Sequence, residues 1–345
     1  MFAERVLSGM RPTGLLHLGH YHGVLKNWVK LQNEFPCLFF VADWHALTTH
    51  YETPEVIKEN VWDMVVDWLA AGVDPEKATL FVQSKVPEHA ELHLLLSMNT
   101  PLSWLERVPT YKDQQEKLSD KDLGTYGFLG YPLLQSADIL IYRATQVPVG
   151  EDQVPHIELT REIARRFNHF YSKEKLLDAK GAEIGRKPIL LEPKALLTEA
   201  SKMPGLDGMK MSKSYQNTLA LRETPENISQ KVRKMPTDPA RVRRTDPGDP
   251  AKCPVWQLHE VYSDASTKQW VQEGCKSAGI GCIQCKEPII QAVTDELAPM
   301  RERAAMYTEN PTLVRKIISE GCERARAMAN DTMQDVRKHM GLDYS

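Results

Sequence analysis

Two short segments of this chain carry histidines and lysines at spacings suited to holding a triphosphate. One is HLGH at residues 17–20, and the other is KMSKS at residues 210–214. In the first, a glycine lets an anion lie directly on the backbone between two imidazoles. In the second, two ammonium groups follow a turn-prone stretch at 204–208, which suits a segment that clamps phosphates and later releases pyrophosphate. We expect both segments to stabilise charge without forming a covalent bond.

The first segment lies where a strand is expected to pass into a helix. Two apolar residues, Val6 and Leu7, precede a turn-prone run at 8–14, and the apolar spacing over 21–29 is helical. A strand, a glycine-containing turn and a helix in this order direct free N–H groups and the positive end of the helix dipole at an anion. The surrounding elements therefore support a phosphate site at residues 17–20.

The first half of the chain predicts a parallel sheet with helices on both faces. Strands are expected at 38–42 and 79–83, joined by a helix that begins near Thr53 and ends at Gly72. Crossovers of this kind place ligands at the carboxyl ends of the strands, which is where His45 would lie. The alternative for His45 is a core histidine with satisfied polar atoms. From about residue 216 helical patterns dominate, so the predicted fold class is α/β, a Rossmann-type parallel sheet with a smaller all-helical C-terminal domain.

Composition and charge fit an ordinary soluble enzyme, with 345 residues and a net charge of −3. The chain has no apolar run approaching the ~18 residues of a membrane helix, and its N-terminus lacks the basic-then-apolar profile of a secretory signal. We therefore expect a cytoplasmic protein without membrane contact. The small net charge excludes a uniformly basic nucleic-acid binder. A local patch that suits either an RNA backbone or a solvated loop comprises Lys231, Arg233, Lys234, Arg241, Arg243 and Arg244.

Together the two segments resemble the HIGH and KMSKS signatures of class I aminoacyl-tRNA synthetases. In that family a Rossmann-type domain carries the first signature early and the second after the last catalytic strand, which matches their order here. The resemblance implies ATP and Mg²⁺ as ligands and charge-stabilising catalysis by His17, His20, Lys210 and Lys213. The ATP site that it implies comprises Arg11, Pro12, Thr13, Gly19, His20, Gly150, Glu151, Asp152, Lys210, Met211, Ser212, Lys213 and Ser214. A small-molecule nucleotidyltransferase also uses an HxGH motif, but it would lack KMSKS and a helical appendage.

The stretch 131–161 is similar to the corresponding region of bacterial tryptophanyl-tRNA synthetases. In that family the aspartate that matches Asp138 accepts a hydrogen bond from the indole N–H, and the VPVGEDQ run at 147–153 surrounds tryptophan and ATP. A buried acceptor rejects phenylalanine because the carboxylate is left unpaired when the N–H is absent. The alternative is that Asp138 caps a helix over 139–142. The tryptophan site that the resemblance implies comprises Gly9, His45, Tyr131, Gln135, Asp138 and Gln153.

Gln135 leaves tyrosine open as the alternative substrate. Many tryptophan enzymes have methionine there, and the spacing of Tyr131, Gln135 and Asp138 also resembles tyrosyl-tRNA synthetases. Tyrosine enzymes usually continue with a GGxDQ-like stretch, and bacterial ones carry a further C-terminal RNA-binding module for which this chain has no room. Tryptophan is therefore favoured. A third possibility is a synthetase-like protein that binds RNA or tryptophan as a regulator.

Four of the six cysteines have a spacing typical of a metal site. Cys253, Cys275, Cys282 and Cys285 form the pattern C-x21-C-x6-C-x2-C. In a cytoplasmic protein such a set indicates a metal rather than disulfides, and both Zn²⁺ and a [4Fe–4S] cluster fit four thiolates. A subset of bacterial tryptophanyl-tRNA synthetases holds a [4Fe–4S] cluster on a closely similar set, so the resemblance favours the cluster in a structural role.

The resemblance also implies a reaction, an organisation and partners. The carboxylate of L-tryptophan attacks the α-phosphate of ATP to give tryptophanyl-adenylate and pyrophosphate, and a ribose hydroxyl of tRNA(Trp) then takes the acyl group. Residues 1–215 would form the catalytic domain, 216–310 an anticodon-binding domain with the cysteines, and 311–345 a last helix that packs back on the catalytic domain. Related synthetases are homodimers, and the apolar region 101–105 is a candidate interface.

Overall fold

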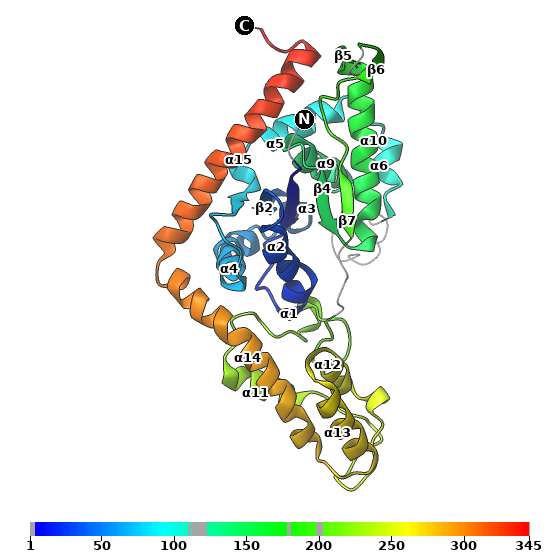
Figure 1. Cartoon of the computed structure of the whole chain (residues 1–345), viewed down its shortest axis with the longest axis vertical. Coiled ribbons are helices and arrows are strands. Elements are labelled where there is room, and N and C mark those ends of the chain that lie inside the picture. The colour runs from blue at the N-terminus through cyan, green and yellow to red at the C-terminus, as the bar shows by residue number, and fades with distance from the viewer. Residues whose placement is uncertain (1–3, 110, 112–122, 178–180, 198–202, 345) are drawn as a thin grey trace.

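The structure, a computed structural model, describes residues 4–109, 111, 123–177, 181–197 and 203–344 (Figure 1). Its centre is a five-stranded sheet in the order β3-β2-β1-β4-β7, and each pairing in it is parallel. This confirms the predicted α/β class. The strands are β1 (Val6–Met10), β2 (Cys37–Val41), β3 (Ala78–Val82), β4 (Gln146–Val149) and β7 (Lys194–Leu197), and a separate antiparallel hairpin joins β5 (Lys175–Leu177) to β6 (Glu183–Arg186).

Helices surround the sheet and continue beyond it. Those of the first half are α1 (Leu18–His20), α2 (Lys26–Leu31), α3 (Asp43–His50), α4 (Glu55–Ala71), α5 (Glu88–Ser97), α6 (Leu102–Glu106), α8 (Tyr126–Leu129), α9 (Tyr131–Ile141) and α10 (Val154–Tyr171). A π-helical turn, Tyr21–Leu25, joins α1 to α2. The later helices are α11 (Pro225–Lys234), α12 (Pro254–Tyr262), α13 (Ala265–Lys276), α14 (Cys282–Thr308) and α15 (Pro311–Met340).

Helix α4 ends where the sequence predicted, but it begins after Pro54 and the Thr53 side chain does not cap it. Gly72 ends α4 in a left-handed conformation with a φ of 104°, which glycine adopts without steric cost. The Thr224 side chain accepts a hydrogen bond from the N–H of Asn227 and so caps α11. In the part of the chain that the structure describes, no helix is both long and apolar enough to cross a membrane.

The core has two halves, one on each face of the sheet. Every residue of β2 is buried, as expected of a central parallel strand with both faces covered. On one face, Phe39 stacks on Trp28 of α2 with ring centroids 4.1 Å apart. On the other face, Phe40 stacks on Phe81 of β3. The apolar sequence of β2 thus reflects burial on two sides rather than amphipathic alternation.

The strand order reverses at β1. The chain runs outward from β1 through β2 to β3, and then returns to place β4 on the other side of β1. In open α/β sheets such a reversal opens a crevice at the carboxyl ends of the two strands, because the following loops diverge to opposite faces. Residues after β1 and β4 therefore meet at a potential ligand site.

From α11 onward the described elements are helices, and they extend away from the sheet before returning to it. Figure 1 shows α12 and α13 at the end of the molecule opposite α15, with α14 leading back towards the sheet. α15 then lies along β3, at the edge of the sheet, and carries ion pairs to α5 through Arg326 and Glu88 at 2.8 Å and through Arg337 and Glu91 at 2.5 Å. The last helix thereby covers an edge strand.

Gly321 is the point at which α15 comes closest to β3. A Cβ at this position would overlap the backbone carbonyl oxygen of Leu80. Relief would require the helix or the strand to shift as a whole, since the obstacle is backbone rather than a flexible side chain.

Gly321→Ala is therefore expected to lower the free energy of unfolding by about 1–3 kcal/mol, the usual cost of overpacking a rigid contact. The measurement is the urea midpoint and thermal melting temperature. Gly127→Ala in α8 is the matched control, because a Cβ there meets nothing within 4 Å. Equal melting temperatures for the two variants would contradict the prediction.

Candidate functional site

A cavity of about 1590 Å³ lies in the crevice between β1 and β4. Its lining comes from three separate stretches of the chain: one near the N-terminus, one in the middle, and one at and after the last strand of the sheet. Of the residues that the sequence indicated, it is lined by Gly9, Arg11, Thr13, His17, Gly19, His20, His45, Tyr131, Gln135, Asp138, Gly150, Glu151, Asp152, Gln153, Lys210, Met211, Ser212 and Lys213. Pro12 is buried behind this lining, and the side chain of Ser214 lies outside the described residues.

The two histidines of the HLGH segment are fixed as neutral donors. The Nδ1 of His17 accepts from the N–H of Gly19 at 3.1 Å, and the Nδ1 of His20 accepts from the N–H of His17 at 3.2 Å. Burial and the charge of Lys213 lower the pKa of His17 to about 4, while burial, His17 and Lys213 lower that of His20 to about 2. With Nδ1 accepting, each ring carries its proton on Nε2. Both rings therefore offer an uncharged N–H donor at the cavity.

The HLGH and KMSKS segments are joined through the backbone. The N–H of Leu18 donates to the carbonyl of Leu219 at 3.0 Å, and that of Leu221 donates to the carbonyl of Leu16 at 3.1 Å. This short antiparallel pairing sets the register between the first segment and the residues that follow the second. Lys213 then reaches across, with its Nζ 2.6 Å from the carbonyl oxygen of Gly14.

A buried carboxylate holds the same junction from behind. Asp67 of α4 accepts from the N–H of Leu16 at 3.2 Å and pairs with the Nε of Arg222 at 2.7 Å, so one carboxylate contacts the backbone before HLGH and a side chain that follows KMSKS. Burial raises the pKa of Asp67 to about 6, against the lowering effect of Arg222. The sequence analysis missed Asp67, although a lone acid between Val66 and Trp68 on an apolar helix face was a usable signal.

Asn217 holds the KMSKS segment in place. Its Oδ1 accepts from the N–H of Ser212 at 2.8 Å, and its Nδ2 donates to Asp207 at 2.7 Å and to the carbonyl of Lys210 at 3.2 Å. The side chain is buried, so it acts as an internal brace for the segment that carries both lysines. Sequence reasoning gave it no role.

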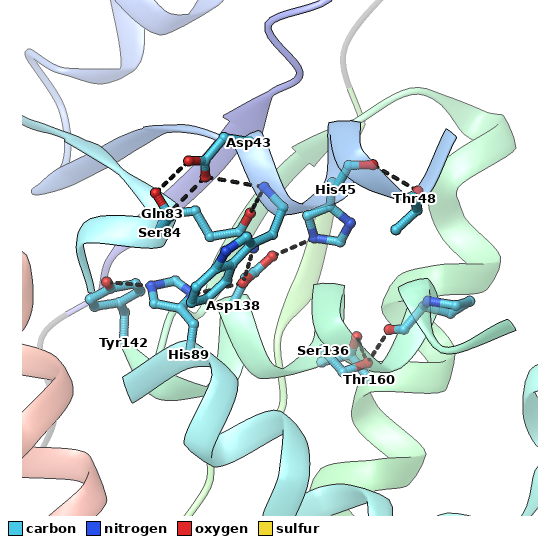
Figure 2. A network of polar contacts seen from close by, with 12 residues as sticks. Asp43, His45, Thr48, Gln83, Ser84, His89, Ser136, Asp138, Tyr142 and Thr160 are labelled. Atoms are coloured by element: carbon cyan, nitrogen blue, oxygen red, sulfur yellow. Dashed lines mark hydrogen bonds and ion pairs between the residues drawn. The ribbon is translucent and has the colours of Figure 1, made fainter. Parts of the chain in front are cut away.

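Asp138 lies at the base of the cavity inside a network of buried donors (Figure 2). His45 Nε2 donates to its Oδ2 at 2.7 Å, while Gln83 Nε2 and His89 Nδ1 donate to its Oδ1 at 2.8 and 2.6 Å. Burial opposes ionisation of Asp138, but its electrostatic interactions and hydrogen bonds with His45 and His89 outweigh this effect and lower the pKa. The site therefore presents an ionised, acceptor-only carboxylate.

These contacts correct one expectation and answer another. Asp138 does not begin or cap a helix over 139–142, because α9 already starts at Tyr131 and the carboxylate accepts from side chains. Pro132 in the first turn of α9 is compatible with a helix start, which places the helix earlier than expected. His45 is hydrogen-bonded to Asp138 and also lines the cavity, so it matches both alternatives, a histidine with satisfied polar atoms and a residue at the ligand site.

Two further cavity residues were not among the predicted ligands. His156 in α10 is buried beside Tyr131, with ring centroids 5.6 Å apart, and burial and the neighbouring His45 lower its pKa to about 4. Phe40 packs so closely on Gly9 that a Cβ there would overlap its ring, which explains a glycine in β1 at the cavity wall. His156 follows the VPVGEDQ run by three residues, and this proximity was the only sequence signal for it.

The four predicted metal-binding cysteines lie at helix ends. Cys253 precedes α12, Cys275 is near the end of α13, and Cys282 and Cys285 are in the first turn of α14. All four are free thiols, and burial together with the other three raises the pKa of Cys285 to about 12. A bound cation would favour the thiolate form of these side chains, so the donor chemistry suits a thiolate-bound metal. Among the described residues, however, no three His, Cys, Asp or Glu side chains are arranged as metal ligands.

The basic segment after KMSKS is only partly available to a partner. Arg241 is buried and donates to the carbonyls of Ile280 and Arg244, so its role is structural. Lys231 forms an ion pair with Glu223, so its charge is already balanced within the protein. Arg233 is exposed but pairs with Glu287, and the other exposed cations of this segment are Lys234, Arg243 and Arg244.

Comparison with known proteins gives consistent matches. A family profile described as "tRNA synthetases class I (W and Y)" matches residues 3–298. The tryptophan–tRNA ligase of Ralstonia nicotianae is 62% identical over 400 aligned positions that cover 100% of both chains. That of Thermotoga maritima is 52% identical and covers 99% of this chain and 100% of its own. A crystal structure of tryptophanyl-tRNA synthetase from Campylobacter jejuni, complexed with ADP and tryptophan, matches with a TM-score of 0.84 at 31% identity, covering 98% of this chain and 100% of that one.

Proposed function

Because the chain belongs to the class I tRNA synthetases of the tryptophan and tyrosine group, with the activity of a tryptophan–tRNA ligase, we propose how its residues divide the reaction. The observation that carries the proposal is a cavity lined both by the two signature segments and by Asp138. Its size suits a nucleotide and an amino acid together. The ADP and tryptophan in the Campylobacter jejuni enzyme support the same pair of ligands here.

In the activation step, the tryptophan carboxylate attacks the α-phosphate of ATP in line, and pyrophosphate leaves. His17 and His20 donate Nε2–H groups to phosphate oxygens, which stabilises charge without adding a net positive charge. Lys210 and Lys213 hold the β- and γ-phosphates, where a bound Mg²⁺ would supply further positive charge for the leaving pyrophosphate. A ribose hydroxyl at the 3′ end of tRNA(Trp) then takes the tryptophanyl group from the adenylate.

Two groups of cavity residues share the binding of substrates. The amino acid contacts Asp138 through its indole N–H, and the neighbouring members of this group are Gly9, His45, Tyr131, Gln135 and Gln153. The nucleotide group comprises Arg11, Pro12, Thr13, Gly19, His20, Gly150, Glu151, Asp152, Lys210, Met211, Ser212, Lys213 and Ser214.

The lowered pKa of Lys213 predicts weaker nucleotide capture in alkaline solution. Burial lowers this pKa to about 8, so the ammonium is charged below that pH and neutral above it. We expect kcat/KM for ATP to fall as the pH rises through about 8. Lys213→Arg should move this alkaline limb to higher pH, since a guanidinium stays charged. A limb that is unmoved in the arginine variant would assign it to another group.

The first test is amino-acid-dependent ATP–pyrophosphate exchange with tryptophan and tyrosine offered separately. Exchange with tryptophan alone is the expected result and supports the role of Asp138. Exchange with tyrosine alone would overturn it in favour of the Gln135 alternative. If both amino acids fail alone, addition of tRNA separates tRNA-dependent activation from a purely regulatory protein.

We also propose that Cys253, Cys275, Cys282 and Cys285 bind a [4Fe–4S] cluster, with Zn²⁺ as the alternative. The mutual electrostatic influence of the cysteines on the pKa values of Cys275 and Cys285, together with the position of the four thiols at three helix ends, supports a structural site that braces the helical region. Iron, acid-labile sulfide and zinc should be quantified in anaerobically purified protein and in Cys282→Ser, with Cys37→Ser as a buried-cysteine control. Absence of all three elements from the wild-type protein would refute a metal site.

The proposed organisation assigns residues 1–215 to catalysis, 216–310 to anticodon binding and 311–345 to the returning helix, in a cytoplasmic homodimer. Within 101–105, Leu102 is exposed whereas Leu105 is buried, so only part of this region can serve an interface. A shallow apolar hollow lined by Leu47, Tyr51 and Tyr126 adds exposed surface of the kind that dimers cover. Light scattering during gel filtration tests the dimer, and the mass of one chain would exclude it.

A further inference from the structure

One oxygen of Asp138 is already saturated by buried donors. Its Oδ1 accepts from both His89 Nδ1 and Gln83 Nε2, at 2.6 and 2.8 Å. Among the residues that the structure describes, its Oδ2 accepts from His45 alone, a residue of the cavity wall. A carboxylate oxygen offers about two lone-pair positions, so the remaining capacity of Asp138 lies on Oδ2.

Gln83 and His89, the two donors to Oδ1, are each oriented by a further hydrogen-bond partner. The Oε1 of Gln83 accepts from the N–H of Trp44 at 3.2 Å, which leaves its Nε2 to face Asp138. The Nε2 of His89 lies 2.7 Å from the hydroxyl oxygen of Tyr142. Burial raises the pKa of Tyr142 well above its ordinary value, so the phenol keeps its proton and donates it to His89.

The chain of contacts from Tyr142 through His89 to Asp138 therefore runs in one direction. With Nε2 accepting from Tyr142, the imidazole proton is assigned to Nδ1, and Figure 2 shows the contacts from His89 to Tyr142 and to Asp138. His89 and Tyr142 are completely buried, and neither lines the cavity. They act on a ligand only through Asp138.

We propose that His89, oriented by Tyr142, is a positioning residue that fixes Asp138 as an acceptor-only group with Oδ2 left for the indole N–H. The inference rests on the proposed tryptophan site. The inference identifies which residues make the site discriminate against amino acids whose ring has no N–H donor. If Asp138 lost an inner donor it would rotate or take up a proton, and a protonated carboxyl can offer an O–H where the ligand needs an acceptor.

The alternative is that His89 serves only as an aromatic filler. Its ring lies against those of Phe40, Phe81 and Tyr142, with centroids between 5.3 and 6.1 Å away. A filler role would make the effect of a substitution on folding depend on the size and polarity of the new side chain, and it would leave discrimination between substrates unchanged. The experiment must therefore compare side chains that differ in where they place a donor.

His89→Asn and His89→Gln are suitable matched variants. The asparagine amide can place an N–H where Nδ1 was, whereas the glutamine amide reaches the Nε2 position and faces Tyr142. Both are polar and differ by one methylene. His89→Leu removes both hydrogen bonds, and thermal melting shows how far each variant remains folded.

The assay is ATP–pyrophosphate exchange with tryptophan and with β-(3-benzothienyl)alanine, in which sulfur replaces the indole N–H. For His89→Gln and His89→Leu we expect the KM for tryptophan to rise about tenfold or more, the scale of a lost hydrogen bond to a charged group. Preference for tryptophan over the sulfur analogue should shrink in parallel. The KM for ATP should stay near the wild-type value, and His89→Asn should restore most of the preference.

The pH dependence of the KM for tryptophan is a measurement that a change in packing alone would not alter. The titratable groups facing Asp138 are His45 from α3, His89 and His93 from α5, and Tyr142 after α9. In His89→Leu the KM for tryptophan should rise as the pH falls toward about 5, because Asp138 gains a proton more easily. The wild-type enzyme, measured in parallel, corrects for the other three groups.

Three results would overturn the inference. One is an unchanged tryptophan KM and analogue preference in folded His89→Leu. Another is equal behaviour of the asparagine and glutamine variants, and a third is a pH profile that matches the wild type. A wild-type enzyme that does not use tryptophan would instead refute the proposed function, so the two failures are distinguishable.

Discussion

Lys213→Ala is expected to slow formation of tryptophanyl-adenylate by about 10²- to 10³-fold, the range found when one preorganised charge-stabilising donor is removed. Its ammonium lies at the cavity, 2.6 Å from the Gly14 carbonyl, and therefore between the two signature segments. The dissociation constant of tryptophan should stay close to the wild-type value, since Asp138 is unaffected. Single-turnover chemical quench measures the first quantity, and calorimetry measures the second.

The control for this prediction is Lys30→Ala, which removes a highly exposed lysine from α2. It should retain wild-type adenylate formation. Lys213→Arg keeps the charge but not the shape of the ammonium, so an intermediate rate is expected. Wild-type activation in Lys213→Ala would remove Lys213 from the catalytic group altogether.

Asp138→Asn is expected to raise the KM for tryptophan by about 10²-fold or more. The amide keeps the shape of the carboxylate, but three donors converge on this side chain, from His45, Gln83 and His89. The NH₂ group of the asparagine must face at least one of these donors. Two donors then meet without an acceptor between them, and each unsatisfied buried group costs about 1–3 kcal/mol. Exchange kinetics with varied tryptophan give the KM, and thermal melting gives the accompanying loss of stability.

Asp295→Asn makes the same chemical change on the exposed surface of α14 and serves as the control. Its kinetics should match those of the wild type. If Asp138→Asn bound tryptophan as well as the parent enzyme does, the carboxylate would not be the indole acceptor.

The parts of the site that sequence predicted share one property: their chemistry is visible locally. Glycine, histidine and lysine at fixed spacing in residues 17–20 and 210–214 indicate phosphate contact before any tertiary structure is known. The parallel sheet followed in the same way, because fully apolar β2 and the stop at Gly72 are local signals. These features need only the chain around them.

The residues that sequence missed act through distant partners. Asp67 meets Leu16 and Arg222, and His89 meets Asp138 and Tyr142, each pair separated by at least 49 positions. Nothing near these residues in the chain specifies such contacts. What the sequence did contain was a lone polar residue within an apolar helix face, which in a buried setting requires a polar partner. That signal marks the residue but leaves its partner unidentified.

The contact between α15 and β3 also orders events during synthesis. The outer edge of β3 is covered by the last helix of the chain, and roughly 230 residues separate Val82 from Pro311. At the ~5–20 residues per second of translation, about 10–50 seconds pass between the emergence of the strand and that of its cover. During this interval a nascent chain exposes unpaired backbone at the edge of a parallel sheet, a template for pairing with neighbouring polypeptides.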